Sequence, residues 1–229
     1  MNFLIENAEK YGINLSEYQA NLLISYKNEV LEQNKTMNLT AITDENEFIE
    51  KHILDSLCGG KFLQNQGSLI DVGCGGGFPS VPLAIAFDKL AVTAIDSTAK
   101  KINFISNATK KLKIENLTAV TARAEDLGRD AFRNKFDFAT ARAVSNLRIL
   151  IELIVPLLKV GGKFVAYKAN DSEIGESQNA LKALNCKIVE TVSFSLPCGD
   201  SRCLIIIEKT AETPLTYPRQ YSQIKNKPL

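Results

Sequence analysis

The chain has 229 residues and a formal net charge of +1, with 45% hydrophobic and 23% charged residues. This balance is typical of a soluble globular protein, and it gives no global sign of an acidic or basic partner. No apolar run reaches the length of a membrane span, and the opening MNFLIENAEK lacks the apolar stretch of a signal peptide. We therefore expect a cytoplasmic protein with no membrane contact.

The first sixty residues predict helices. Ser16 and Gln19 form a capping box, and apolar residues recur at helical spacing after it. A further helix is expected to begin at Asp44, and His52 falls on its apolar face, where we interpret it as a packing residue. We predict a helical extension over residues 1–60 that packs on the main domain.

Strand patterns then alternate with helical ones, which indicates a parallel sheet covered by helices on both faces. The last two strand patterns, 186–196 and 203–208, are separated by six residues. A parallel crossover needs roughly ten to twelve, so these two strands should run antiparallel. Earlier strands are expected at 68–73, 90–96, 117–122, 135–141 and 162–168, with helices from Pro79 to Phe87, Thr98 to Lys111 and Leu147 to Leu158.

This topology favours one fold class over its nearest relative. A single antiparallel strand at the end of a parallel sheet is typical of methyltransferases, whereas dinucleotide-binding sheets are usually parallel throughout. We predict an α/β, Rossmann-like fold of the class I S-adenosylmethionine (SAM)-dependent methyltransferases. Its seven-stranded, mostly parallel sheet, with an antiparallel last strand, should occupy residues 61–210, followed by a basic C-terminal tail at 211–229.

A glycine-rich segment, DVGCGGGFP (71–79), joins the first strand to the next helix. Gly73, Gly75 and the two glycines after them permit a sharp turn and close approach to a ligand. The dinucleotide motif G-x-G-x-x-G fails in both registers, and no Gly-Lys-Ser/Thr of a P-loop is present. The Asp71 carboxylate is a poor neighbour for a pyrophosphate and a good one for the cationic amino-acid portion of SAM. A purely structural loop is the alternative.

Polar residues lie at the ends of the next three strands or directly after them. Asp96 can accept both ribose hydroxyls of an adenosine, or it can simply cap a helix. In the segment Arg123–Asp126, an acid such as Glu125 can meet an adenine amino group, or cap a short helix. Arg142 follows the fourth strand and offers donors to a base, a phosphate or a cofactor carboxylate, with a surface ion pair as its alternative.

Basic residues are unevenly distributed. The tail 217–229 carries three and the segment 100–113 carries five, each without an acid. Either segment could contact phosphate or be a solvated surface. The predicted RNA contacts are Arg123, Lys168, Arg202 and Arg219.

The five cysteines form no C-x-x-C pair and His52 is the only histidine, which argues against a metal site or a histidine-based triad. We expect reduced thiols. Cys74 could be proposed as a nucleophile, but a small side chain in a glycine turn needs no reactive role.

Several segments, taken in order, resemble the RsmG (GidB) family of bacterial 16S ribosomal RNA guanine-N7 methyltransferases. They are NLTAI, HILDSL, DVGCGGGFPSVPLAI, DS-TAKKINFI, ARAED, ATARAVSNL and YPRQYSQIKNKPL. The resemblance spans nearly the whole chain. It implies SAM as the cofactor, and a substrate guanine in the decoding-region loop, presented as 16S ribosomal RNA or a 30S subunit. The implied cofactor contacts are Gly73, Phe78, Ala124, Glu125 and Arg142.

The chain departs from the family pattern at two positions. The family usually has Ser where this chain has Ala141, and Gly where it has Ser80. The first difference removes any hydroxyl contact at that position. Neither removes the Arg142 guanidinium or the glycine loop.

Guanine N7 has an exposed lone pair, so no base is needed before it reacts, and the lack of a histidine base is expected. The enzyme's predicted task is positioning, which can lower a barrier by roughly 7–11 kcal/mol at best. Arg142, as the catalytic residue, and the basic rim would hold the guanine and its phosphates, with Phe78 shaping the pocket. The rivals are an NAD-type oxidoreductase, which lacks its third glycine here, and a non-catalytic RNA-binding factor. We expect a monomer.

Overall fold

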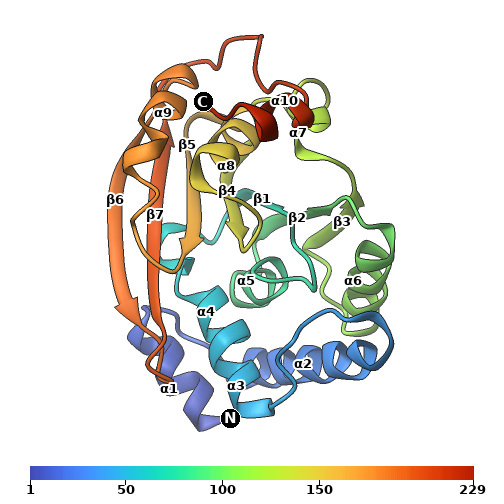
Figure 1. The fold of residues 1–229 in the computed structure, drawn as a ribbon. Coiled ribbons are helices and arrows are strands. Elements are labelled where there is room, and N and C mark those ends of the chain that lie inside the picture. The colour runs from blue at the N-terminus through green and yellow to red at the C-terminus, as the bar shows by residue number, and fades with distance from the viewer.

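The computed structural model describes residues 1–229 and is built around one seven-stranded sheet (Figure 1). The strand order is β3-β2-β1-β4-β5-β7-β6. Neighbouring strands are parallel from β3 to β5, and β7 runs antiparallel to both β5 and β6. The predicted mostly parallel sheet with an antiparallel last strand is confirmed, and β7 lies inside the sheet. The strands are β1 (Gly67–Val72), β2 (Leu90–Asp96), β3 (Leu117–Thr121), β4 (Phe136–Arg142), β5 (Leu158–Lys168), β6 (Cys186–Ser195) and β7 (Ser201–Lys209).

The helix predicted from Leu147 to Leu158 is shorter than expected. It ends at Ile154 and continues as a 3-10 turn, after which β5 begins at Leu158. Pro156 is the physical reason, because proline has no N–H for an α-helical bond and clashes with the preceding turn. The helices are α1 (Asn2–Lys10), α2 (Glu17–Met37), α3 (Glu45–Phe48), α4 (Asp55–Leu57), α5 (Ser80–Ala86), α6 (Ala99–Lys111), α7 (Ala124–Leu127), α8 (Leu147–Ile154), α9 (Gln178–Ala183) and α10 (Tyr221–Asn226).

The N-terminal helices begin where the sequence indicates. Ser16 Oγ accepts from the Gln19 N–H at 3.2 Å, and the Gln19 side chain accepts from the Ser16 N–H, so the capping box is confirmed. Asp44 caps α3. Between α3 and α4 the backbone widens into a π-helical turn, Ile49–Leu54, which was not predicted from the sequence. Such turns are rare in proteins, and those that occur are often found at functional sites.

The two ends of the chain pack on opposite faces of the sheet. Leu4, Tyr26 and Phe48 belong to one continuous core with α5, α6 and one sheet face. Ile224 of α10 is buried with α8 and α9 on the other face. Arg133 ties the tail down by donating to the Tyr217 carbonyl at 2.8 Å. The division into 1–60, 61–210 and 211–229 stays a prediction. No helix is long and apolar enough to span a membrane.

Parallel strands bring the candidate site together. The carboxyl ends of β1 to β5 lie at one edge of the sheet, so the segments that follow them become neighbours. In Figure 1, α3 and α4 of the N-terminal extension lie below this edge. The residues that gather there come from both parts of the chain.

Candidate functional site

The glycine loop after β1 is held from two sides. The Gly73 N–H donates to the Ile95 carbonyl at 2.9 Å, and the Gly75 N–H donates to Asp96 Oδ2 at 3.2 Å, which ties the loop to β2. From the other side, the Tyr26 hydroxyl of α2 donates to the Gly76 carbonyl at 2.8 Å. Gly73, Gly75 and Gly77 all have positive φ, which only glycine adopts without strain. The loop therefore has a defined conformation, which the N-terminal extension supports in part.

Asp71 lies beneath this loop and is fully buried. Its Oδ2 accepts from the Ser80 N–H at 3.1 Å and its Oδ1 accepts from the Thr140 hydroxyl at 3.0 Å. Burial raises the pKa of Asp71 from 3.8 to about 6, and the two hydrogen bonds offset only part of that shift. Asp71 does not line the cavity above the loop. Its predicted contact with a cofactor stays a prediction, and the structure gives this carboxylate a bracing role between β1, β4 and α5.

Asp71→Asn is expected to remove a pH-dependent cost in stability. Because the folded-state pKa is raised, the native protein binds this proton more tightly than the unfolded chain, so stability falls as pH rises from about 4 to about 6. The full cost, up to about 3 kcal/mol, is present above that window. Urea unfolding of both proteins between about pH 4 and about pH 7 measures it. The wild-type protein should lose stability relative to the variant as pH rises, and a constant difference would contradict the assignment.

Above the loop lies a cavity of about 410 Å³, here called the glycine-loop cavity. Asp96 borders it, with Oδ1 accepting from the Thr98 N–H at 2.8 Å. Cys74 is buried, and burial raises the pKa of its thiol well above the usual value, so it is a poor nucleophile. The lining comprises Leu39, Thr40, His52, Gly73, Cys74, Gly75, Gly76, Phe78, Asp96, Ser97, Lys101, Arg142, Ala143 and Val144.

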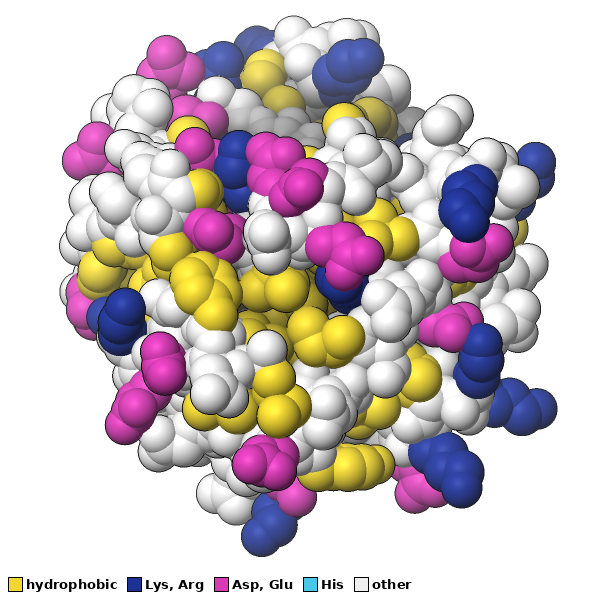
Figure 2. All heavy atoms as spheres, turned by 90° about the horizontal axis from the view of Figure 1, so that it is seen from below, with side chains coloured by type: hydrophobic (Ala, Val, Ile, Leu, Met, Phe, Trp, Pro, Cys, Tyr) yellow, Lys and Arg dark blue, Asp and Glu magenta, His cyan; other side chains and the backbone are white.

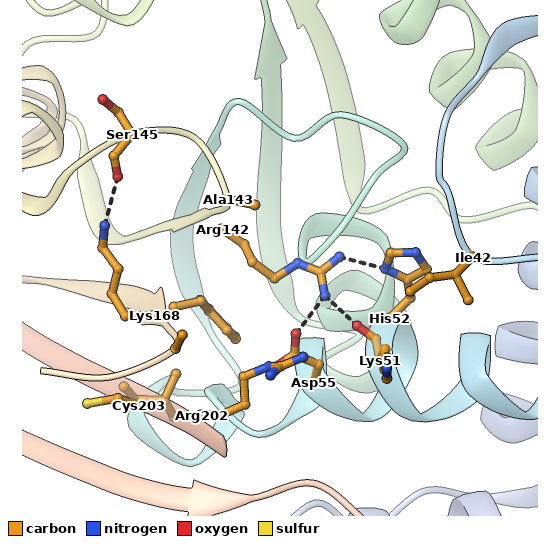
Figure 3. A pocket seen from close by; sticks show the side chains of 13 residues that line it. Ile42, Lys51, His52, Asp55, Arg142, Ala143, Ser145, Lys168, Arg202 and Cys203 are labelled. Carbon is orange, nitrogen blue, oxygen red and sulfur yellow. Dashed lines mark hydrogen bonds and ion pairs between the residues drawn. The ribbon is translucent and has the colours of Figure 1, made fainter. Parts of the chain in front are cut away.

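A second cavity, of about 430 Å³, adjoins the first and is here called the arginine cavity (Figure 3). Its wall combines basic side chains with apolar and aromatic ones. It is lined by Ile42, Lys51, His52, Asp55, Arg142, Ala143, Ser145, Tyr167, Lys168, Ala169, Arg202, Cys203 and Leu204. Three residues, His52, Arg142 and Ala143, line both cavities. The boundary between the cavities therefore consists of the end of β4 and one turn of the N-terminal extension.

Arg142 is the centre of this boundary. Its Nη1 donates to the Lys51 carbonyl and to Asp55 Oδ2, both at 2.9 Å, and its Nη2 lies 3.0 Å from His52 Nδ1. Figure 3 shows the guanidinium enclosed by these three residues. A guanidinium has five N–H donors, so Nε–H and one Nη2–H remain for a ligand. The guanidinium also lies over the Phe78 ring, 5.5 Å from its centroid.

The contacts of His52 determine its tautomer. A guanidinium only donates, so Nδ1 must accept from Arg142 and the proton must sit on Nε2. Nε2 then donates to Thr40 Oγ1 at 2.7 Å. Burial, and next the nearby charge of Arg142, lower the pKa of His52 to about 3. His52 does pack, stacked on Phe78, but it is also a neutral acceptor for Arg142.

Four cationic side chains and one acid, Asp55, line the arginine cavity, and carboxylates outside the lining pair with three of the four cations. Asp55, which is 4% exposed, accepts from both Arg142 and Arg202, so two cations share one buried carboxylate. Lys168 donates to Glu173 and to the Ser145 carbonyl, both at 2.7 Å, which fixes the segment after β4. On the face seen from below in Figure 2, basic and acidic side chains mix around apolar patches. That face offers no continuous basic field.

The other predicted site residues lie apart from the two cavities. Ala124 and Glu125 are buried at the start of α7, and the segment before α7 is joined to β2 by the Ala122 N–H, which donates to the Asp96 carbonyl. Glu125 and Arg123 line a separate hollow with Tyr221 of the tail. Arg219 is paired with the buried Glu152, its Nη2 2.6 Å from Oε2. The cofactor contacts at Ala124 and Glu125 and the RNA contacts at Arg123 and Arg219 stay predictions.

Four residues of the N-terminal extension were not singled out for a role at the site by their sequence. Lys51, His52 and Asp55 surround Arg142, and Tyr26 supports the glycine loop. One signal was available, since His52 and Asp55 are three residues apart and therefore lie on the same side of a helix. Their partner could not be identified from it.

Comparisons with known proteins agree with this arrangement. A family model described as rRNA small subunit methyltransferase G (GidB) matches residues 19–202. The chain belongs to this family. It is 45% identical over 227 residues to a ribosomal RNA small subunit methyltransferase G from Streptococcus pyogenes serotype M1, covering 96% of both chains. It is 40% identical over 232 residues to one from Alkaliphilus metalliredigens, covering 99% of this chain and 97% of that one. The resemblance noted from the motifs is confirmed.

Solved structures show the same fold at low identity. A SAM-dependent O-methyltransferase from Thermotoga maritima has a TM-score of 0.55 and 18% identity, covering 81% of this chain and 72% of its own. P. horikoshii TYW2, solved in complex with MeSAdo, has a TM-score of 0.56 and 14% identity, covering 69% and 62%. The predicted class I methyltransferase fold is confirmed.

Proposed function

We propose that this member of the family transfers a methyl group from SAM to N7 of a guanine in 16S ribosomal RNA, acting as a monomer in the cytoplasm. The observation that carries the proposal is the meeting of two cavities at Arg142. One is bordered by glycines and a carboxylate, and the other is basic with apolar walls. Donor and acceptor molecules bound in these cavities would meet at that boundary.

The glycine-loop cavity suits SAM by its donor set. The nearest atom to a Cβ built on Gly75 is 4.0 Å away, so the space above this glycine is open to a ligand. Asp96 can accept from ribose hydroxyls. Arg142 has two free donors that suit a carboxylate. When bound, SAM supplies a methyl group on a cationic sulfur.

The arginine cavity suits an RNA base with its phosphates. Lys51, Lys168 and Arg202 provide positive charge that attracts the backbone. Tyr167 and Leu204 provide surface for the flat base. Because guanine N7 needs no deprotonation, neither the neutral His52 nor the protonated Cys74 is required as a base. The protein's contribution is the orientation of the guanine against the boundary at Arg142.

The test is methyl transfer to 30S subunits isolated from cells that lack this protein. The purified protein and isotopically labelled SAM should label 16S ribosomal RNA, and borohydride reduction followed by aniline should cleave the strand at one N7-methylguanine. Subunits from cells that contain the protein are the control and should accept no label, and naked 16S ribosomal RNA compares the two substrate forms. Label on another atom, or no label on either substrate, would refute the proposal.

A further inference from the structure

We infer that His52 is a positioning residue, which holds the Arg142 guanidinium at the boundary between the two cavities by accepting its Nη2–H at Nδ1. The inference rests on the proposed methyl transfer. It makes the N-terminal extension part of the active site.

Three residues hold Arg142: Lys51 and His52 lie in one turn, and Asp55 directly follows that turn. The Lys51 carbonyl and Asp55 Oδ2 both accept from Nη1, whereas His52 Nδ1 alone accepts from Nη2. The segment is the π-helical turn, in which the Asp55 N–H donates to the Glu50 carbonyl five residues back. The first two contacts hold one end of the guanidinium, and the His52 contact fixes its rotation.

The His52 ring is itself fixed on three sides. It stacks on Phe78 of the glycine loop, with centroids 4.8 Å apart and planes at 18°, and Phe48 meets it edge-on at 4.7 Å. Thr40 Oγ1 accepts its Nε2–H and also accepts from the Ile42 N–H, so both lone pairs of this oxygen are used. This arrangement keeps Nδ1 free of a proton and directed at Arg142.

Loss of the His52 acceptor should displace the Arg142 guanidinium but leave it at the boundary between the two cavities. A misplacement of about 1 Å at a reacting site can cost on the order of 10²-fold in rate. The effect should therefore appear in the rate of methyl transfer more than in the stability of the fold.

The chain offers a matched pair of variants. In His52→Asn the side-chain oxygen can take the place of Nδ1 and accept from Arg142. In His52→Gln the amide reaches the place of Nε2 and leaves Arg142 Nη2 without its acceptor. We expect His52→Gln to lower kcat/KM for 30S subunits on the order of 10²-fold and His52→Asn to recover at least about tenfold of that loss. Equal losses in the two variants at equal thermal stability would overturn the inference.

An NMR measurement on the wild-type protein tests the inference without turnover, and it does not depend on the folding of the His52 variants. His52 is the only histidine, so a protein labelled with 15N in histidine gives one pair of ring nitrogen signals. At neutral pH these should report a protonated Nε2 and an unprotonated Nδ1, and Arg142→Lys should shift Nδ1 more than Nε2. The opposite tautomer, or an imidazolium, would overturn the inference. If the wild-type protein transfers no methyl group, the proposed function fails separately, whatever the tautomer.

Discussion

Arg142→Ala is expected to reduce methyl transfer to 30S subunits by about 10²- to 10³-fold, the range typical of losing one well-placed donor at a reacting site. Arg142 is the only charged residue that lines both cavities, since His52 is neutral. Its loss should therefore weaken SAM binding and substrate orientation together. Single-turnover rates and calorimetric SAM titration measure the two effects.

Arg202→Ala is the matched control for this change. Both variants remove an arginine from the same buried carboxylate of Asp55, and both leave the other arginine in place. The cost in stability should be below the 3–5 kcal/mol of a buried charge left wholly unpaired in both variants. It should be the larger in Arg142→Ala, which also leaves the Lys51 carbonyl and His52 Nδ1 without this donor. Arg202 lines only the arginine cavity, so its variant should keep SAM affinity. Unchanged turnover in Arg142→Ala would remove this residue from the mechanism.

The fold could be predicted because its rules are local. The alternation of strands and helices indicates a parallel sheet, and the six-residue link between the last two strands requires a reversal. The error in α8 also has a local cause, since the apolar periodicity continues past Ile154 while Pro156 ends the hydrogen bonding.

The site could be predicted only where sheet topology gathers it. Asp96 and Arg142 end their strands and Gly75 follows β1, and because the ends of these parallel strands meet, the three residues lie close together. Asp71 shows the limit of that reasoning. It lies one residue before the end of β1, yet its side chain turns beneath the loop to the Ser80 N–H and the Thr140 hydroxyl. Strand position does not determine which face a terminal side chain will use.

Contacts across the chain lie beyond sequence reasoning. Asp55 and Arg142 are 87 residues apart, and no helical or strand spacing relates them. The π-helical turn that contains Lys51 and His52, and that directly precedes Asp55, has no composition signal of its own. Two polar residues three positions apart on a helix are compatible with simple packing, and only the folded arrangement shows that His52 and Asp55 meet an arginine.

Gly77→Ala is expected to destabilise the protein by about 2–4 kcal/mol and to weaken SAM binding, because overpacking and left-handed strain act together. A Cβ on Gly77 would lie 2.2 Å from Tyr26 Oη and 2.9 Å from Val81 Cγ2, at a φ of +88°. Relief of this contact requires Tyr26 to move, which breaks its hydrogen bond to the Gly76 carbonyl and releases the glycine loop from α2.

Gly161→Ala separates the two causes. Its φ is +83°, close to that of Gly77, but a Cβ there meets no atom within 4 Å. This variant should lose only the left-handed strain, about 1–2 kcal/mol in urea unfolding, and should bind SAM as the wild type does. Adding Tyr26→Phe to Gly77→Ala removes the closest contact and should recover part of the stability, although Cζ remains at 3.1 Å. Equal destabilisation by Gly77→Ala and Gly161→Ala would mean that α2 does not press on the loop, and the N-terminal extension would then act on the site through Arg142 alone.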